Sequence, residues 1–429
     1  MQNNRDTSRR PRPSHDHALL EMARTWLATL SFVDGLSVAI VMLSLVLFKR
    51  FGLTLPEITL YVALLWLPLA LRPVVETMLM RVRLTPRSWI VSTEAVMAAS
   101  FWVAAYTLIF LQWRFSTMLL LWLSTMAGVV HHVALRRYQL QVFAKSRLDV
   151  AERVGRVCHG LALVVVVGVC TMIGGNLEVL NRNIPTSWAM VLTAVAMMAS
   201  ACCVLHLLFL RRVTVVDPKP TGQPQWTLRS IFAATTERLS GWANVRLLLL
   251  LILMGLEGMF GGVAVVFLVD ASHNGGVSLS PQEFGLAMGS IGVMTFVAGM
   301  VMRRSVRLAE NLRKGTGLVG AAFTVQFAMF LLISYLTPVS LPAVIASVAV
   351  AELAHGAAMS AFFELLDRSL GKRFQSQSRA GCVAVASLLA VVGCAVSGLV
   401  QDATGYHNFF ILMVVLGAVT TIASSNRKF

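Results

Sequence analysis

Long runs of apolar residues alternate with short polar segments along the chain of 429 residues. A helix needs about 20 mostly apolar residues to cross a hydrocarbon core about 30 Å thick. Because backbone groups in lipid have no water to bind, each run is expected to form a continuous, internally hydrogen-bonded helix. The pattern predicts twelve membrane-spanning helices, at 26–48, 60–80, 89–111, 116–136, 157–177, 188–210, 247–269, 283–302, 317–337, 341–365, 381–400 and 408–424.

Nearly all of the 36 lysines and arginines lie in the tails and in the loops between these helices, and their number alternates from loop to loop. Every second loop is rich in arginine, and the intervening loops contain only Lys49, Arg50, Arg114 and Arg182. Arg72 is the one basic residue inside a predicted span. Because loops rich in lysine and arginine stay on the cytoplasmic side, both chain termini are expected in the cytoplasm.

The composition is that of a membrane protein. Hydrophobic residues make up 57% of the chain and charged residues 13%, with a mean hydropathy of +0.73, whereas soluble proteins average about 25% charged residues. The net charge of +16 is spread over loop clusters, so it indicates topology and a lipid bilayer as partner rather than nucleic acid. The six cysteines form no CxxC pair, so they are expected to pack as small apolar side chains and to bind no metal.

The longest internal loop separates six predicted helices from six. Membrane transporters are often built from two parallel repeats of this kind. A weak repeat supports the division, because Asp34-Gly35 in the first helix corresponds to Glu257-Gly258 in the seventh. The expected segments are a cytoplasmic tail without signal-peptide features at 1–25, a first bundle at 26–210, a cytoplasmic loop at 211–246, a second bundle at 247–424 and a cytoplasmic tail at 425–429.

The first two predicted helices carry charges within the membrane. At about 1.5 Å per residue, Asp34 and Arg72 both lie roughly 12 Å from the cytoplasmic ends of their helices, and Glu76 is one turn from Arg72. We hypothesise that Arg72 is held between Asp34 and Glu76. The alternative is that Arg72 extends to the cytoplasmic interface and Glu76 lies near the lipid headgroups. Pro73 removes a helical hydrogen bond and is expected to kink the second helix beside the charge.

Further ionisable residues are predicted near the membrane midplane in the second half. Glu257 lies there in the seventh helix and Glu352 in the tenth, with His355 one turn beyond. Carboxylates at such positions are candidates for substrate, ion or proton sites. The alternative is a carboxyl group kept neutral by polar neighbours. Gln326 in the ninth helix is a candidate hydrogen-bonding residue in a cavity.

Five stretches share motifs with one group of transporters. They are "FVDGLSVAIVMLSLVLFKRFGLTLPEITLYVALLWLPLALRP" (32–73), "FLVDASHNGGVSLSPQEFGLAMGSIGVMTFVAGMV" (267–301), "AELAHG" (351–356), "SGLVQDATGYHNFF" (397–410) and, in layout only, the region 127–167. Together they resemble the AmpG-type muropeptide permeases of the major facilitator superfamily. Arg72 stands where that family usually has a lysine, and Glu257 and Glu352 match its acids in helices 7 and 10.

The resemblance implies an all-α polytopic membrane protein with twelve helices in two six-helix bundles around a central cavity. It also implies secondary transport of peptidoglycan-derived anhydromuropeptides from the periplasm into the cytoplasm. The driving force would be a proton gradient across the bacterial inner membrane, with no bound cofactor, and a monomer is expected.

The chain departs from the family's pattern in its fourth helix. Where the family usually has H-D-x-x-x-D-G, this sequence has "HHVALRR", in which His131 and His132 are followed by Arg136 and Arg137. We interpret the two histidines as packing or interface residues. The loss of both acids is typical of a diverged relative with another cargo.

Motifs of soluble enzymes are missing from the sequence: it has no Walker A, GxSxG or HExxH pattern, so a transporter is expected rather than an enzyme. The first interpretation is a proton symporter that imports a muropeptide or similar amphipathic anion by alternating access. Arg72 would either attract a carboxylate of the cargo or lock the charge cluster of the first two helices, and Glu257 and Glu352 would couple transport to protons. The alternatives are a drug or siderophore exporter of the same fold, and a transport-inactive membrane scaffold or sensor.

Overall fold

The computed structural model describes residues 26–82, 84–110, 113–143, 148–210, 227–240, 245–289, 312–336, 340–370 and 375–425. Within these residues the chain is helical and contains no strand. Several predicted segments lie wholly or partly outside them: the tail at 1–25, the loop at 211–246 apart from 227–240 and 245–246, residues 290–302 of the eighth helix, and the tail at 425–429 beyond Ser425.

The helices of the first half follow the predicted spans closely. They are α2 (Leu27–Arg50), α3 (Leu55–Ala70), α4 (Arg72–Arg81), α5 (Pro86–Thr107), α6 (Trp113–Val142), α7 (Leu148–Leu163), the π-helix η2 (Val164–Cys170), α8 (Thr171–Asn181) and α9 (Ile184–Phe209). The second half contains α10 (Leu228–Leu239), α11 (Val245–Val269), the short 3₁₀ helix η4 (Ser272–Asn274), α12 (Pro281–Met288), α14 (Leu312–Leu336), α15 (Leu341–Ser369) and α16 (Gln375–Ser425).

Capping residues and prolines fix where several of these helices begin. In α3 the Thr54 and Glu57 side chains form a capping box, and Ser280 and Glu283 do the same for α12. At α9 the Asn183 side chain accepts a hydrogen bond of 2.9 Å from the Thr186 amide. A proline stands at the first or second helical position in all three helices, where its missing N–H costs no helical bond.

The second predicted span and the long helix α16 are interrupted where the sequence contains proline or glycine. The second predicted span divides into α3 and α4 at Leu71, between Pro68 and Pro73, which confirms the expected kink beside Arg72. The continuous helix expected for each run is therefore wrong here, because each proline removes an amide donor. In α16, Gly405 has φ 76°, and this non-helical residue separates the predicted eleventh and twelfth spans.

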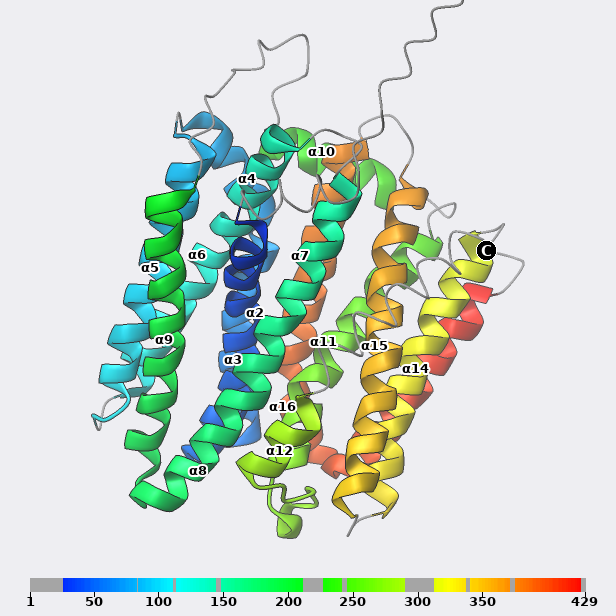
Figure 1. Cartoon of the computed structure of the whole chain (residues 1–429). Helices are drawn as coiled ribbons and strands as arrows, with labels where there is room; N and C mark the ends of the chain where they lie inside the picture. The colour runs from blue at the N-terminus through cyan, green and yellow to red at the C-terminus, as the bar shows by residue number, and fades with distance from the viewer. Residues whose placement is uncertain are drawn as a thin grey trace, which may run out of the picture.

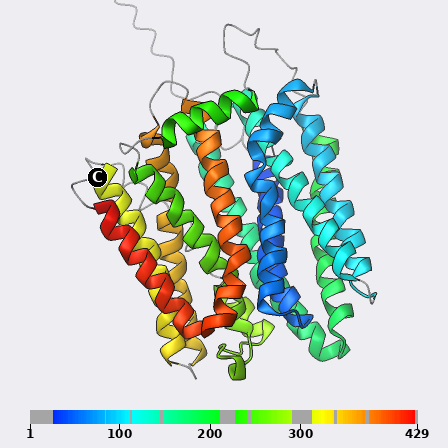
Figure 2. The same ribbon diagram turned by 180° about the vertical axis from the view of Figure 1, so that it is seen from behind.

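The helices form two groups that lie side by side (Figures 1 and 2). In the first group α5 packs on α6 and α9, and α2 packs on α6 and α7. In the second, α16 packs on α11 and α14, and α14 packs on α15. The groups meet through α3 with α16, α8 and η2 with α12, and α2 with α11. Within the described residues, ten helical segments are long and apolar enough to cross a membrane, so the predicted all-α polytopic fold is confirmed.

We call the end where α2 stops at Arg50 and α12 starts at Pro281 the closed end, and the opposite one the arginine-rich end. At the closed end the two groups are in close contact. A Cβ at Gly398 of α16 would lie 2.7 Å from the Pro56 Cα of α3. A Cβ at Gly168 of η2 would lie 2.9 Å from the Gly289 Cα beside α12. Glycine is therefore what allows the backbones of the two groups to meet here.

Candidate functional site

A cavity of about 1280 Å³ lies between the two groups of helices. Its wall includes residues close to the arginine-rich ends of α6, α7, α15 and α16, so it reaches that end of the molecule. Many of its lining side chains are ionisable: Asp34, Arg72, His132, Arg136, Glu152, Arg153, Arg156, His159, Glu364, Asp367 and Arg379.

The charges are divided unequally between the two walls of the cavity. The first group of helices contributes four arginines and two histidines against Asp34 and Glu152. The second group contributes Glu364 and Asp367 against Arg379. Two ion pairs lie within single walls, Arg136 with Glu152 at 2.9 Å and Arg379 with Asp367 at 2.5 Å. The cavity therefore has a basic wall, and the facing wall has two carboxylates against one arginine.

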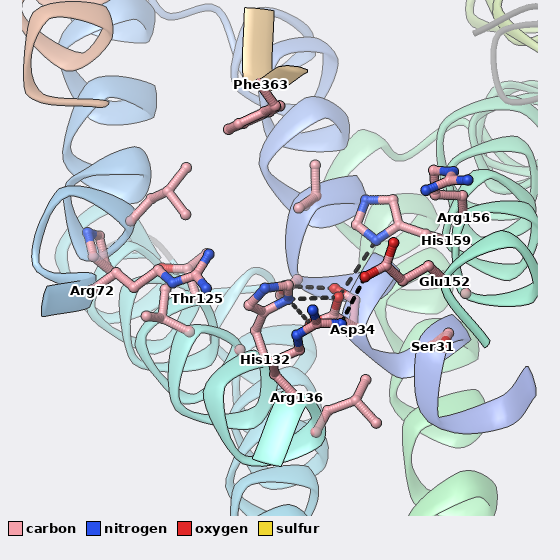
Figure 3. Close-up of a pocket in the computed structure, with 18 of the residues that line it drawn as sticks. Ser31, Asp34, Arg72, Thr125, His132, Arg136, Glu152, Arg156, His159 and Phe363 are labelled. Atoms are coloured by element: carbon pink, nitrogen blue, oxygen red, sulfur yellow. Dashed lines mark hydrogen bonds and ion pairs between the residues drawn. The ribbon is translucent and has the colours of Figure 1, made fainter. Parts of the chain in front are cut away.

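Asp34 lies in the cavity wall beside His132 and His159 (Figure 3). Its carboxylate oxygens are 3.0 and 3.1 Å from His132 Nδ1, and Oδ2 is 3.7 Å from His159 Nδ1. Its Oδ1 is also 3.8 Å from the buried His131 Nδ1. The hypothesis that Asp34 pairs with Arg72 is therefore wrong. The imidazoles of α6 and α7 are nearer, because α2 packs directly on these two helices.

Arg72 forms the ion pair with Glu76 that the spacing predicts. The Arg72 Nε and Glu76 Oε1 are 2.9 Å apart, and both side chains are mostly buried, at 25% and 20% exposure. Arg72 also lines the cavity, although Glu76 is not among the lining residues. Glu76 neutralises part of the charge of Arg72 while the guanidinium keeps further donors for other partners.

A second cluster of ionisable residues lies behind the cavity wall and includes Glu94 and His206, which the sequence analysis did not single out. Glu94 of α5 is fully buried between His131 of α6 and His206 of α9. The signal was present in the sequence, because Glu94 falls inside the predicted span 89–111 and His206 inside 188–210. The interpretation of His131 as a packing residue is incomplete, since it contacts two carboxylates.

In the second group of helices, three predicted site residues come together. The Gln326 amide donates a 3.1 Å hydrogen bond to Glu257 Oε1, and the same oxygen lies 2.8 Å from His355 Nδ1. Glu352 is close enough to interact electrostatically with both His355 and Glu257. None of the four lines the cavity. The sequence therefore predicts a cluster that is present, but the structure places it outside the cavity wall.

At the closed end, the last two residues of α2 both form ion pairs. Lys49 Nζ is 2.6 Å from Asp270 Oδ1, which connects the end of α2 to the end of α11. Arg50 of α2 pairs with Glu178 of α8. Asp270 lies just beyond the membrane-spanning part of α11. Burial raises its pKa, but hydrogen bonds from Lys49, Asn274 and Tyr406 and the charge of Lys49 hold that pKa below the usual range.

The sequence matches no protein-family model, and no curated protein matches it significantly. Solved structures do share its fold. The nucleoside transporter NupG aligns with a TM-score of 0.69 and 15% identity, over 94% of this chain and 98% of that one. A POT family transporter in complex with 5-aminolevulinic acid aligns with a TM-score of 0.65 and 10% identity, over 94% and 95%.

A third solved structure is a bacterial homologue of the human lysosomal transporter Spinster, in an inward-facing and unoccupied conformation. It aligns with a TM-score of 0.63 and 14% identity, over 96% of each chain. Because these identities are low, the similarities establish only the fold. This chain has the all-α polytopic fold of the major facilitator transporters.

Proposed function

We propose that this chain is a secondary active transporter of the bacterial inner membrane that imports a peptidoglycan-derived muropeptide, or a similar amphipathic anion, together with protons. The segments 26–210 and 247–424 move against each other as two bundles in alternating access. Both chain termini lie in the cytoplasm, the protein acts as a monomer, and the proton gradient supplies the energy without a cofactor.

The observation that carries this proposal is a large cavity that reaches one end of the helices while the other end is closed. A secondary transporter must expose its binding site to one side of the membrane at a time. In the predicted orientation the arginine-rich end faces the cytoplasm, so the structure corresponds to an inward-open state.

The size of the cavity suits a solute larger than a nucleoside or a single amino acid. Pockets for drug-sized ligands measure about 300–1,000 Å³, and this cavity has about 1280 Å³. A sugar with a short attached peptide fits such a volume. The resemblance to the AmpG-type permeases in residues 32–73 and 397–410 supports the same class of cargo.

The charges of the cavity support an anionic cargo with both polar and apolar parts. Arg72 on the basic wall is suited to a carboxylate, because a guanidinium presents several donors in a planar array. The apolar lining residues Trp66 and Phe363 supply contact area for a sugar ring or an apolar side chain. The POT family neighbour was solved with 5-aminolevulinic acid, which also carries a carboxylate.

Proton coupling is assigned to the cluster in the second group of helices. Glu257 and Glu352 both interact electrostatically with His355 and with each other. Protons can therefore be exchanged among two carboxyl groups and an imidazole. The Gln326 amide fixes one carboxylate oxygen of Glu257. Movement of α11 against α15 would change the distance between Glu257 and His355 and so couple the protonation of these residues to transport.

The test is uptake of labelled anhydromuropeptide into cells that express the chain, with and without a protonophore. We expect accumulation that the protonophore abolishes, compared with cells carrying the empty vector. Efflux rather than uptake in oriented vesicles would favour the exporter. A purified protein that is not thermally stabilised by any anhydromuropeptide would contradict the proposed cargo.

A further inference from the structure

Two arginines of α7 line the cavity although the sequence pattern places them before a membrane span. Arg153 and Arg156 precede the predicted span 157–177, whereas α7 begins at Leu148 and carries both residues into the cavity wall. At about 1.5 Å per residue, Arg156 lies about 12 Å from the start of the helix. Arginines that only set the topology belong to the loops. The position of Arg156 in the cavity wall therefore indicates a role in binding.

Close packing of α7 on α2 fixes which face of α7 is turned to the cavity. A Cβ at Gly35 of α2 would lie 2.7 Å from the Ala162 Cβ and 2.8 Å from the His159 carbonyl oxygen. Glycine therefore allows the two helices to touch here. Arg153, Arg156 and His159 follow one another at intervals of three residues, so they lie on one face of α7. All three line the cavity.

The positive charge of the cavity wall is concentrated in two places. On α4, Arg72 lines the cavity, and its ion pair with Glu76 offsets part of its charge. On α6 and α7, the lining residues include three arginines and one glutamate: Arg136, Arg153, Arg156 and Glu152. Glu152 lies 2.9 Å from Arg136. The lining residues of α6 and α7 thus provide a second basic region, distinct from that of Arg72.

Asp34 lies between the two basic regions. In Figure 3, Arg72 is on one side of Asp34, and Arg156 is on the other. A negative group of the cargo beside this carboxylate would be repelled. Glu364 and Asp367 of α15 add negative charge on the facing wall. The two basic regions are therefore the favourable places for anionic groups, and the part of the cargo next to Asp34 is expected to be uncharged.

We propose that the cavity recognises a cargo with two separated anionic groups, carboxylates or phosphates, joined by an uncharged middle part. One group binds Arg72, and the other binds Arg153 and Arg156. A guanidinium has five N–H donors, so it can bind an anionic group of the cargo in addition to a protein partner. This inference rests on the proposed function and specifies the class of its cargo. Arg153 and Arg156 are then the residues that distinguish dianions from monoanions.

A sugar with a short acidic peptide satisfies this pattern. The terminal carboxylate of such a peptide and the carboxylate of an acidic side chain are separated by uncharged amide groups. The apolar lining residues Trp66 and Phe363 can pack against the uncharged part. The cavity of about 1280 Å³ has room for both ends of such a molecule at once.

The experiment measures the binding of linear dicarboxylates of increasing chain length to the purified full-length protein, by ligand-induced thermal stabilisation. Each diacid is compared with its monomethyl ester, which keeps the chain and loses one charge. We expect a chain length at which the diacid binds about tenfold more tightly than its ester, the size of one hydrogen bond to a charged group. If no diacid binds more tightly than its ester, the proposal is overturned.

Arg156→Gln tests the second basic region directly. This variant is expected to lower the affinity for the diacid about tenfold, to that of the ester. The affinity for the ester should change much less, because a monoanion can still bind at Arg72. Arg114→Gln is the control outside the cavity and should leave both affinities unchanged. If Arg156→Gln weakens diacid and ester equally, Arg156 does not bind a second anionic group and the proposal is wrong.

Arg153→Gln provides a second variant with the same expected pattern, for use if Arg156→Gln does not fold. A parallel measurement replaces one carboxylate of the best diacid by a phosphate ester. Tighter binding of the phosphate compound than of the diacid would identify phosphate as the second group, and weaker binding would identify carboxylate.

The diacids are not muropeptides, so they separate this inference from the proposed function. If diacids bind with the expected dependence on Arg156 but no anhydromuropeptide is taken up, the site for two anionic groups stands and the proposed cargo is wrong. If anhydromuropeptide is taken up but Arg156→Gln and Arg153→Gln leave its affinity unchanged, the transporter stands and the second basic region does not bind cargo.

Discussion

Lys49 Nζ and Asp270 Oδ1 lie 2.6 Å apart and connect the two groups of helices at the closed end. The second oxygen of Asp270 accepts a 2.7 Å hydrogen bond from the Tyr406 hydroxyl of α16, and Asn274 donates to the first at 3.0 Å. Asp270 therefore fixes α2, α11 and α16 relative to one another. In the proposed alternating-access cycle, this contact would break each time the closed end opens.

Asp270→Asn is expected to lower the free energy of unfolding by about 2 kcal/mol. This is less than the roughly 3–5 kcal/mol for a fully buried pair, because Lys49 is still 20% exposed. Since the pKa of Asp270 lies below its usual range, the contribution is complete above about pH 4 and is lost as the pH falls through the lowered pKa. Thermal unfolding of the purified protein at several pH values measures this contribution to stability.

Asp402→Asn provides the matched control, because Asp402 is an exposed acid of α16 four residues before Tyr406. We expect a stability loss in Asp270→Asn that is constant from about pH 5 to 8 and shrinks below about pH 4. If the difference in unfolding free energy between Asp270→Asn and the unmodified chain grows on acidification, Asp270 does not stabilise the fold as a carboxylate.

Gly398→Val is expected to prevent α3 and α16 from closing together. The added side chain would collide with Pro56 and Thr59, so the population should shift away from the state that is open at the arginine-rich end. The readout is maleimide labelling of Phe363→Cys in the cavity, counted above the background of the native cysteines. Labelling should fall several-fold.

Gly261→Val serves as its control, because no atom outside the neighbouring backbone of α11 lies within 4 Å of a Cβ placed at this glycine. The control should label like the parent. Equal labelling in the Gly398 and Gly261 variants would show that the α3–α16 contact does not set the conformation.

The fold was largely predictable from the sequence because apolar length and basic loops report directly on membrane crossing. Helix ends such as those of α2 and α11 fall within a few residues of the predicted spans. The interruption at Leu71 followed from Pro68 and Pro73. The π-helix η2 was not predictable, since its "VVVVGVC" has no residue that distinguishes it from an α-helix.

The site was predictable only in part, because pairing depends on how helices rotate and pack. The spacing of Arg72 and Glu76 within one helix fixed their contact in advance. The partners of Asp34 are imidazoles of α6 and α7. The depth of Asp34 in the membrane did not distinguish these imidazoles from Arg72 as its partner. Similarly, Glu94 and His206 are 112 residues apart, and only the packing of α5 on α9 brings them together.

Arg72→Gln is expected to reduce anhydromuropeptide uptake at least tenfold, chiefly through a higher KM, because one charge-assisted contact to a carboxylate is lost. Arg72→Lys should retain part of the activity, since it keeps the charge and loses the planar donor array. Arg114→Gln is the control: Arg114 also pairs with a glutamate, at 3.4 Å, but lies outside the cavity. A loss of kcat alone in Arg72→Gln would indicate a gating role instead.

Glu257→Gln is expected to abolish concentrative uptake and to leave the protein folded. The substitution keeps the side-chain shape but removes the proton that Glu257 would exchange with His355, 2.8 Å away. Counterflow of labelled against unlabelled cargo needs no net proton movement, so it should persist in the same variant. Glu178→Gln at the closed end changes a carboxylate outside this cluster and should leave the dependence on the proton gradient intact. Undiminished proton-driven accumulation in Glu257→Gln would exclude Glu257 as the coupling residue and transfer that role to Glu352.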